Sequence, residues 1–183
     1  MRNITIVGPR SVGKTTLCKS LSKKLHLKHI EMDKVVNKKL KKYGGLNTAI
    51  KSGAIDNFIL NDSVNIIQKV FGKKRIIVDL AGGAISSKRF SESSNRIIKT
   101  IKSKSKVIGI LPYENNKRSI NFLFEREKER VHFKNESKIK LKNKVKEDYL
   151  KVKRKLIGIA DFIIYTKDRK PGGIVKEILM RVK

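Results

Sequence analysis

Gly8-Pro9-Arg10-Ser11-Val12-Gly13-Lys14-Thr15 matches the pattern G-x4-G-K-[ST] at every required position. A short β-branched run at residues 4–7 precedes this stretch, and leucines at four-residue spacing follow it over residues 14–25. The pattern predicts a buried strand, a loop and an amphipathic helix in direct succession. Glycines let backbone N–H groups curl around phosphate oxygens, and the start of a helix adds positive potential there. The stretch therefore predicts a phosphate-binding loop.

The residue types of this loop also indicate roles. Lys14 is expected to be catalytic by reaching the β- and γ-phosphates of a nucleotide, and the Thr15 hydroxyl is expected to ligate Mg²⁺. ATP and Mg²⁺ are therefore the predicted cofactors. The predicted nucleotide contacts are the loop residues and the next hydroxyl, namely Gly8, Arg10, Ser11, Val12, Gly13, Lys14, Thr15 and Thr16. The alternative interpretation is a glycine turn that caps a helix and binds nothing.

Apolar runs alternate with helical patterns along the rest of the chain. Strands are predicted at residues 27–31, 75–80, 106–111 and 161–166. Helices are predicted at residues 33–43, 56–71, 90–101 and 171–182. Another is predicted through at least the second half of the lysine-rich stretch 138–146 and on to about residue 159. Strands joined through helices imply a mostly parallel sheet covered on both faces, so the predicted class is a three-layer α/β fold. The 183 residues are expected to form one domain.

The charge is the most unusual feature of the composition. The chain has 45 Lys and Arg residues against 16 Asp and Glu residues, which gives a formal net charge of +29. Such a charge suits anionic substrates and is also typical of nucleic-acid binders. However, 34 of the 45 cations are lysine, whereas phosphate-clamping and base-reading proteins favour arginine. Nucleic acid is therefore expected only as a secondary partner.

Targeting signals and cysteine pairs are absent from the sequence. No apolar run is long enough for a signal peptide or a transmembrane helix, so we expect a cytoplasmic protein without membrane contact. The one cysteine, Cys18, excludes an internal disulfide framework and is expected to be a small packed hydrophobe. We expect the protein to be a monomer.

Three carboxylates lie where predicted strands end. Asp33 is the candidate base or substrate-orienting group, because ligands bind beyond the carboxyl ends of strands in such sheets. Its alternative role is to cap the helix that begins at Lys34. Asp79 follows three β-branched residues, as does the Walker B Asp that holds Mg²⁺, although it could instead form a strand-end hydrogen bond. Glu31 is a candidate to hold Mg²⁺ through water, or else a surface carboxylate.

Two glycines and two arginines complete the candidate site. Gly82 and Gly83 either allow substrate to approach the backbone closely or form an ordinary turn. Arg126 and Arg130 lie four residues apart, and a closing lid could bring them to the transferring phosphoryl group. We expect Arg126 to bind the nucleotide and Arg130 to take part in catalysis. The alternative is that the interleaved glutamates at 125, 127 and 129 simply pair with both arginines.

Taken in order, these motifs resemble the shikimate kinase family over nearly the whole chain. Besides the phosphate loop, the matching segments are Glu31-x-Asp33, Ala81-Gly82-Gly83-Ala84, Arg130-Val131-His132-Phe133, Ala160-Asp161-Phe162 and the loop from Thr166 to Pro171. The resemblance implies a P-loop NTPase fold with a five-stranded parallel sheet of order 2-3-1-4-5. It also implies a lid at about residues 126–146, and ATP-dependent phosphorylation of shikimate.

The two arginines that bind the substrate carboxylate in that family are missing. Phe58 is followed by Ile59 rather than by Arg, and the place of the second Arg is taken by Val152. Lys151, Lys153 and Arg154 lie beside it, and Arg154 is the substrate-binding candidate among them. A lysine point charge replaces a bidentate arginine poorly, so the acceptor is open.

The main hypothesis is therefore a kinase for a small-molecule hydroxyl or phosphate acceptor, similar to shikimate kinase. One alternative is a nucleoside monophosphate kinase. A second is an ATP-binding, RNA-associated protein without small-molecule kinase activity, and a third is a degenerate kinase that binds ATP without turnover.

Overall fold

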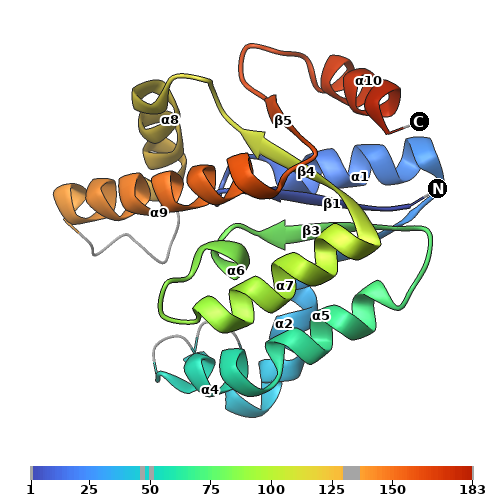
Figure 1. Cartoon of the computed structure of the whole chain (residues 1–183). Coiled ribbons are helices and arrows are strands. Elements are labelled where there is room, and N and C mark those ends of the chain that lie inside the picture. Colours follow the sequence, from blue (N-terminus) through green and yellow to red (C-terminus); the bar gives the residue numbers. More distant parts are fainter. Residues whose placement is uncertain (1, 46–47, 50–51, 130–136, 183) are drawn as a thin grey trace.

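The computed structural model describes residues 2–45, 48–49, 52–129 and 137–182 (Figure 1). The central element is a sheet of five parallel strands: β1 (Asn3–Gly8), β2 (Lys28–Glu31), β3 (Ile76–Ala81), β4 (Ser105–Leu111) and β5 (Phe162–Tyr165). Their order is β2-β3-β1-β4-β5, which confirms the order implied by the family resemblance. The central strand, β1, is buried along its whole length, whereas the edge strands β2 and β5 are partly exposed.

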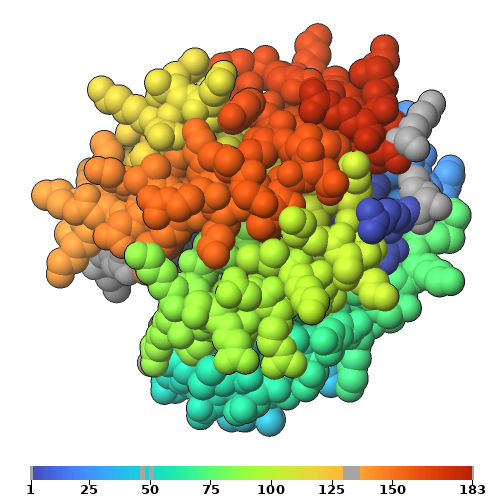
Figure 2. All heavy atoms as spheres, viewed as in Figure 1, coloured from blue at the N-terminus to red at the C-terminus, as the bar shows by residue number. Residues whose placement is uncertain are grey.

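Helices cover both faces of this sheet. They are α1 (Lys14–Leu25), α2 (Met32–Lys39) with the 3₁₀ turn η1 (Leu40–Tyr43), α4 (Ala54–Asn61), α5 (Ser63–Phe71), α6 (Gly83–Ser86), α7 (Ser91–Lys104), α8 (Asn116–Lys128), α9 (Lys138–Ile159) and α10 (Pro171–Arg181). Helices α1 and α10 lie together on one face, while α7 and α9 cover the other (Figure 1). In the space-filling view, α7 and α9 form a continuous surface that hides the sheet (Figure 2). The predicted three-layer fold is confirmed.

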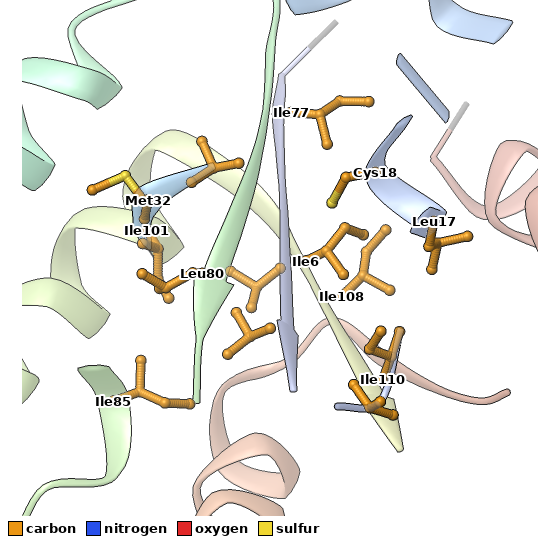
Figure 3. Close-up of a cluster of buried hydrophobic side chains, with 14 of the residues drawn as sticks. Ile6, Leu17, Cys18, Met32, Ile77, Leu80, Ile85, Ile101, Ile108 and Ile110 are labelled. Atoms are coloured by element: carbon orange, nitrogen blue, oxygen red, sulfur yellow. The ribbon is translucent and has the colours of Figure 1, made fainter. Parts of the chain in front are cut away.

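The core follows from the alternation of side chains along the strands. Ile6 and Ile108 are register partners and point towards Leu17 and Cys18 of α1 (Figure 3). Leu80 points the opposite way, towards Ile101 of α7 (Figure 3). These six side chains are all less than 9% exposed, so each face of the sheet has its own apolar layer.

One predicted helix differs from the observed ones. The helix predicted at residues 56–71 is two helices, because Asp62 interrupts it between α4 and α5. The helix predicted through at least the second half of the lysine-rich stretch is present, and α9 covers the whole stretch. Ser137 caps its first turn by accepting a hydrogen bond from the Lys140 amide at 3.3 Å. The buried stripe of α9 already begins at Leu141, which anchors the lysine-rich turn to the core.

The described residues contain no helix that is long and apolar enough to cross a membrane.

Gly82 is a point of close packing, and its neighbour Gly83 provides a matched control. A Cβ at Gly82 would lie 2.6 Å from Val152 Cγ2 and 2.9 Å from the Gly8 carbonyl oxygen, whereas a Cβ at Gly83 would meet nothing within 4 Å. We expect Gly82→Ala to lower the free energy of unfolding by about 1–3 kcal/mol through overpacking. Gly83→Ala, at the start of α6, should be neutral or stabilising by up to about 1 kcal/mol. Urea denaturation of both variants measures this difference, and equal stabilities would contradict the packing argument.

Candidate active site

The phosphate loop joins the end of β1 to the start of α1. Gly13 adopts a left-handed conformation with φ +102°, which favours glycine and lets the chain turn into the helix. Ser11 is also left-handed, with φ +62°. The Lys14 ammonium donates a hydrogen bond to the Pro9 carbonyl oxygen at 3.0 Å, so this side chain folds back over its own loop. The predicted strand, loop and helix are therefore present.

Gly8 lies where three backbone segments meet. A Cβ there would collide with the Ile110 carbonyl oxygen of β4, and the Gly8 carbonyl accepts a hydrogen bond from the Gly82 amide at 3.1 Å. The first glycine of the motif is thus required for strand packing as well as for the loop.

The Thr15 hydroxyl and Asp79 lie together at the carboxyl end of β3. Thr15 Oγ1 donates to Asp79 Oδ2 at 2.6 Å, which brings together two of the three predicted metal ligands. Asp79 is only 7% exposed, and this burial raises the pKa of its carboxyl group. The Thr15 hydrogen bond and the nearby Lys14 charge oppose that rise.

Lys14 shares this electrostatic environment. Burial lowers the pKa of its ammonium group, and the charges of Asp79 and Asp33 counteract the decrease. One cation and two carboxylates therefore influence one another at the mouth of the loop.

Glu31 and Asp33 lie on the β2 side of the same end of the sheet. Glu31 is the register partner of Asp79, so their side chains lie on the same face. Glu31 Oε1 accepts a hydrogen bond from Lys34 at 2.8 Å, and this bond lowers the pKa of Glu31. Asp33 is exposed in the first turn of α2, which begins at Met32. The structure therefore does not show Asp33 as the helix cap, and its carboxylate is open to solvent.

A hollow of about 410 Å³ lies on the other side of the loop. The residues lining it include Gly13, Thr16, Phe122, Arg126 and Lys167. The cations of Arg126 and Lys167 lie 5.5 and 4.7 Å from the centre of the Phe122 ring. Thr16 and Arg126, both predicted to bind the nucleotide, therefore line the same hollow. Phe122 is not among the residues predicted from the sequence, although its spacing of four residues from Arg126 on one helix is a usable signal.

Glu127 of α8 binds the phosphate loop directly. Its side chain accepts a hydrogen bond from Ser11 Oγ and lies 3.9 Å from Arg10 Nε, at 4% exposure. The alternative that the interleaved glutamates pair with both arginines is tested by the structure for Arg126 alone, because Arg130 lies outside the described residues. Within the described part of the chain no ion pair joins Arg126 to these glutamates: Glu127 contacts the loop and Glu125 pairs with Lys128.

Val152, which stands at the place of one family arginine, is a buried residue. It is 3% exposed and packs against Gly82, so glycine at position 82 is required by this contact and by the nearby Gly8 carbonyl oxygen. Gly83 faces open space. Arg154 is exposed on α9, and within the described part of the chain it forms no hydrogen bond or ion pair with the site. The catalytic candidate Arg130 and the adjacent His132 lie outside the described residues.

A second and larger hollow, of about 1040 Å³, lies at the opposite end of the sheet. Its described lining residues include seven cations and no carboxylate: Arg2, Lys73, Lys74, Arg75, Arg96, Lys99 and Lys104. These residues flank the amino ends of β1 and β3, whereas the phosphate loop follows the carboxyl end of β1. The positive charge is therefore not confined to the candidate site.

Comparison with known proteins identifies the family. The family model described as shikimate kinase matches residues 10–183. The chain belongs to the shikimate kinase family. It is a P-loop small-molecule kinase, as the sequence predicted, and an ATP-dependent enzyme by that membership. A search of curated proteins finds no match.

Solved structures agree on the fold of this kinase. Shikimate kinase from Bacteroides thetaiotaomicron superposes with a TM-score of 0.77 at 16% identity, covering 99% of this chain and 98% of that one. The Acinetobacter baumannii shikimate kinase in complex with shikimate has a TM-score of 0.71 at 18% identity, with 100% and 93% coverage. Dephospho-CoA kinase from Campylobacter jejuni has a TM-score of 0.60 at 16% identity, with 98% and 96% coverage.

Proposed function

We propose that this kinase transfers the γ-phosphoryl group of ATP, with Mg²⁺, to a hydroxyl group of a small molecule. The observation that supports this most strongly is the Thr15–Asp79 hydrogen bond beside Lys14 at the mouth of the loop. A hydroxyl and a carboxylate are the oxygen ligands that Mg²⁺ prefers, so these two residues fit the ion. When bound, Mg²⁺ would neutralise charge on the phosphate oxygens.

Each site residue then has a proposed role. Lys14 stabilises the charge on the β- and γ-phosphates, and the loop amides hold the same oxygens. Glu31, beside Asp79 in the sheet, would help to hold the ion through water. Asp33 orients the acceptor hydroxyl and accepts its proton, because an exposed carboxylate at this end of the sheet faces arriving ligands. Arg126 contacts the nucleotide, and Arg130 acts late from the lid.

The nucleoside of ATP would occupy the 410 Å³ hollow beside the loop. Phe122 offers it an apolar ring, and Arg126 and Lys167 already lie near that ring. The hollow borders Gly13 and Thr16, so its occupant would be continuous with phosphates in the loop.

The acceptor is recognised without the arginine pair of the family. Val152 is buried against Gly82, so a cation at this position would need a different packing of α9. Shikimate, the ligand of the Acinetobacter baumannii relative, would therefore lose its carboxylate clamp here. Acceptors with hydroxyl groups but no carboxylate suit this site better. A nucleoside monophosphate remains the second candidate, and the comparisons give no support to an RNA-associated role.

The test is a panel of acceptors with ATP and Mg²⁺, containing shikimate, gluconate, polyols, nucleosides and nucleoside monophosphates. ADP release is measured for the unaltered chain and for Lys14→Ala, and mass spectrometry identifies the phosphorylated product. We expect ADP release above that of Lys14→Ala with at least one hydroxyl acceptor. Release with nucleoside monophosphates alone would favour the second candidate. No release with any acceptor would contradict the kinase proposal.

A further inference from the structure

Three different metal-ligand side chains converge behind the phosphate loop. The Cys18 sulfur, an imidazole nitrogen of His29 and a carboxylate oxygen of Asp79 all lie within 4.8 Å of one another. They come from α1, β2 and β3, so the fold rather than local sequence brings them together. Cys18 points from α1 towards the sheet, near Ile77 of β3 (Figure 3).

The sheet register explains the convergence. His29 pairs with Ile77, and Glu31 pairs with Asp79, so His29 and Asp79 project from the same face of adjacent strands. Thr15 of α1 already bonds to Asp79 on this face, and Cys18 follows it by three residues, about one helical turn. The same side of α1 therefore presents a hydroxyl and a thiol to one carboxylate.

His29 provides a second, independent observation. Its Nε2 atom is buried, and it is the one buried side-chain nitrogen or oxygen in the described part of the chain without a hydrogen-bond partner. A buried polar atom without a partner is costly, so this nitrogen has its bonding capacity open to a ligand.

We propose that Cys18, His29 and Asp79 form a binding site for Zn²⁺ or a similar transition-metal cation. Sulfur, nitrogen and oxygen together are a zinc ligand set, whereas Mg²⁺ prefers oxygen alone. Three protein ligands with one position left for water is a common zinc arrangement. The donors of a tetrahedral zinc ion lie about 3.5 Å apart, so small side-chain rotations close the site. As the Zn–S bond forms, the Cys18 thiol loses its proton to solvent.

This site shares Asp79 with the proposed Mg²⁺ site, so binding has a consequence for catalysis. The Thr15 hydrogen bond uses Asp79 Oδ2, and a zinc ion on the Cys18 side would draw the carboxylate away from the loop. Zn²⁺ should then inhibit phosphoryl transfer by removing a ligand that Mg²⁺ needs. This consequence rests on the proposed function, whereas metal binding does not.

Cobalt is the direct probe, because Co²⁺ replaces Zn²⁺ and its thiolate complexes absorb light. Full-length protein freed of metal with a chelator is titrated with Co²⁺, then with Zn²⁺. We expect one Co²⁺ ion per chain, sulfur-to-cobalt charge-transfer absorption and its loss when Zn²⁺ is added. Cys18 is the only cysteine, so this absorption can arise only there. Absence of charge-transfer absorption in the folded, unaltered chain would overturn the proposal.

Variants then test the individual ligands. Cys18→Ala should abolish the absorption, and His29→Asn should weaken Co²⁺ binding by roughly tenfold or more. The matched control is His26→Asn, because His26 is exposed at the end of α1 with φ +51°, a conformation that Asn tolerates. Equal Co²⁺ affinities of His29→Asn and His26→Asn would overturn the role of His29.

Zn²⁺ inhibition of ADP release should disappear in Cys18→Ala and persist in His26→Asn. A chain that binds Co²⁺ but phosphorylates no acceptor would contradict the proposed function without contradicting the proposed metal site.

Discussion

Replacing Lys14 with alanine should lower the rate of ATP-dependent phosphoryl transfer by roughly 10³-fold, the loss expected when a group that stabilises the transferred charge is removed. The Lys14 ammonium lies over the loop that would hold the phosphates, and it donates a hydrogen bond to the Pro9 carbonyl oxygen at 3.0 Å. Binding of ATP would replace this internal hydrogen bond with contacts to phosphate. The measurements are kcat and kcat/KM for ATP with the best acceptor of the panel.

Two comparisons show whether such a loss is specific. Lys23→Ala removes an exposed lysine from the last turn of the same helix, and it should leave kcat/KM unchanged. The Lys14 variant should be folded, because burial lowers the pKa of Lys14 and the charged group is therefore not a source of stability. A kcat of Lys14→Ala within a few-fold of that of the unaltered chain would contradict a role of the phosphate loop in the mechanism.

The fold could be predicted because its determinants are local. The three central strands β1, β3 and β4 are short runs rich in β-branched residues, and helices with leucine or isoleucine at helical spacing follow them. The strand order came from the family resemblance rather than from these patterns. The helix predicted at residues 56–71 was wrong in one respect, because hydrophobic periodicity continues through Asp62, where the chain bends between α4 and α5.

The phosphate-loop part of the candidate site could also be predicted from the sequence, because the motif places its residues within eight consecutive positions. Contacts between elements that are distant in the sequence could not be predicted. Glu127 binds Ser11 across more than a hundred residues, and nothing in its acidic surroundings distinguishes it from Glu125. In the same way, Cys18, His29 and Asp79 meet only through the sheet register and the orientation of α1. Hydrophobic periodicity shows which face of a helix or strand is buried, but it does not show which of these faces pack against one another.

Converting Asp79 to asparagine should separate function from stability in this protein. Asparagine keeps the shape and can still accept the Thr15 hydrogen bond, but it lacks the charge that Mg²⁺ needs. We expect kcat/KM to fall by roughly 10²-fold, and the Mg²⁺ concentration for half-maximal rate to rise by roughly tenfold. Burial raises the pKa of Asp79, so its ionised form is disfavoured in the folded state relative to the unfolded chain. Folding stability contributed by this group is therefore present at low pH and lost as the pH rises through its folded pKa.

At neutral pH, Asp79→Asn should consequently melt at a higher temperature than the unaltered chain while being far less active. The difference in melting temperature should shrink as the pH is lowered towards the unfolded pKa of an aspartate, because the native carboxyl group then becomes protonated. Thermal melts at several pH values and Mg²⁺ titrations of the rate measure the two effects. The exposed Asp33 gives the matched comparison, since Asp33→Asn should lower kcat without changing the melting temperature. A loss of both stability and activity in Asp79→Asn would show that the Asp79 charge supports the fold rather than the metal.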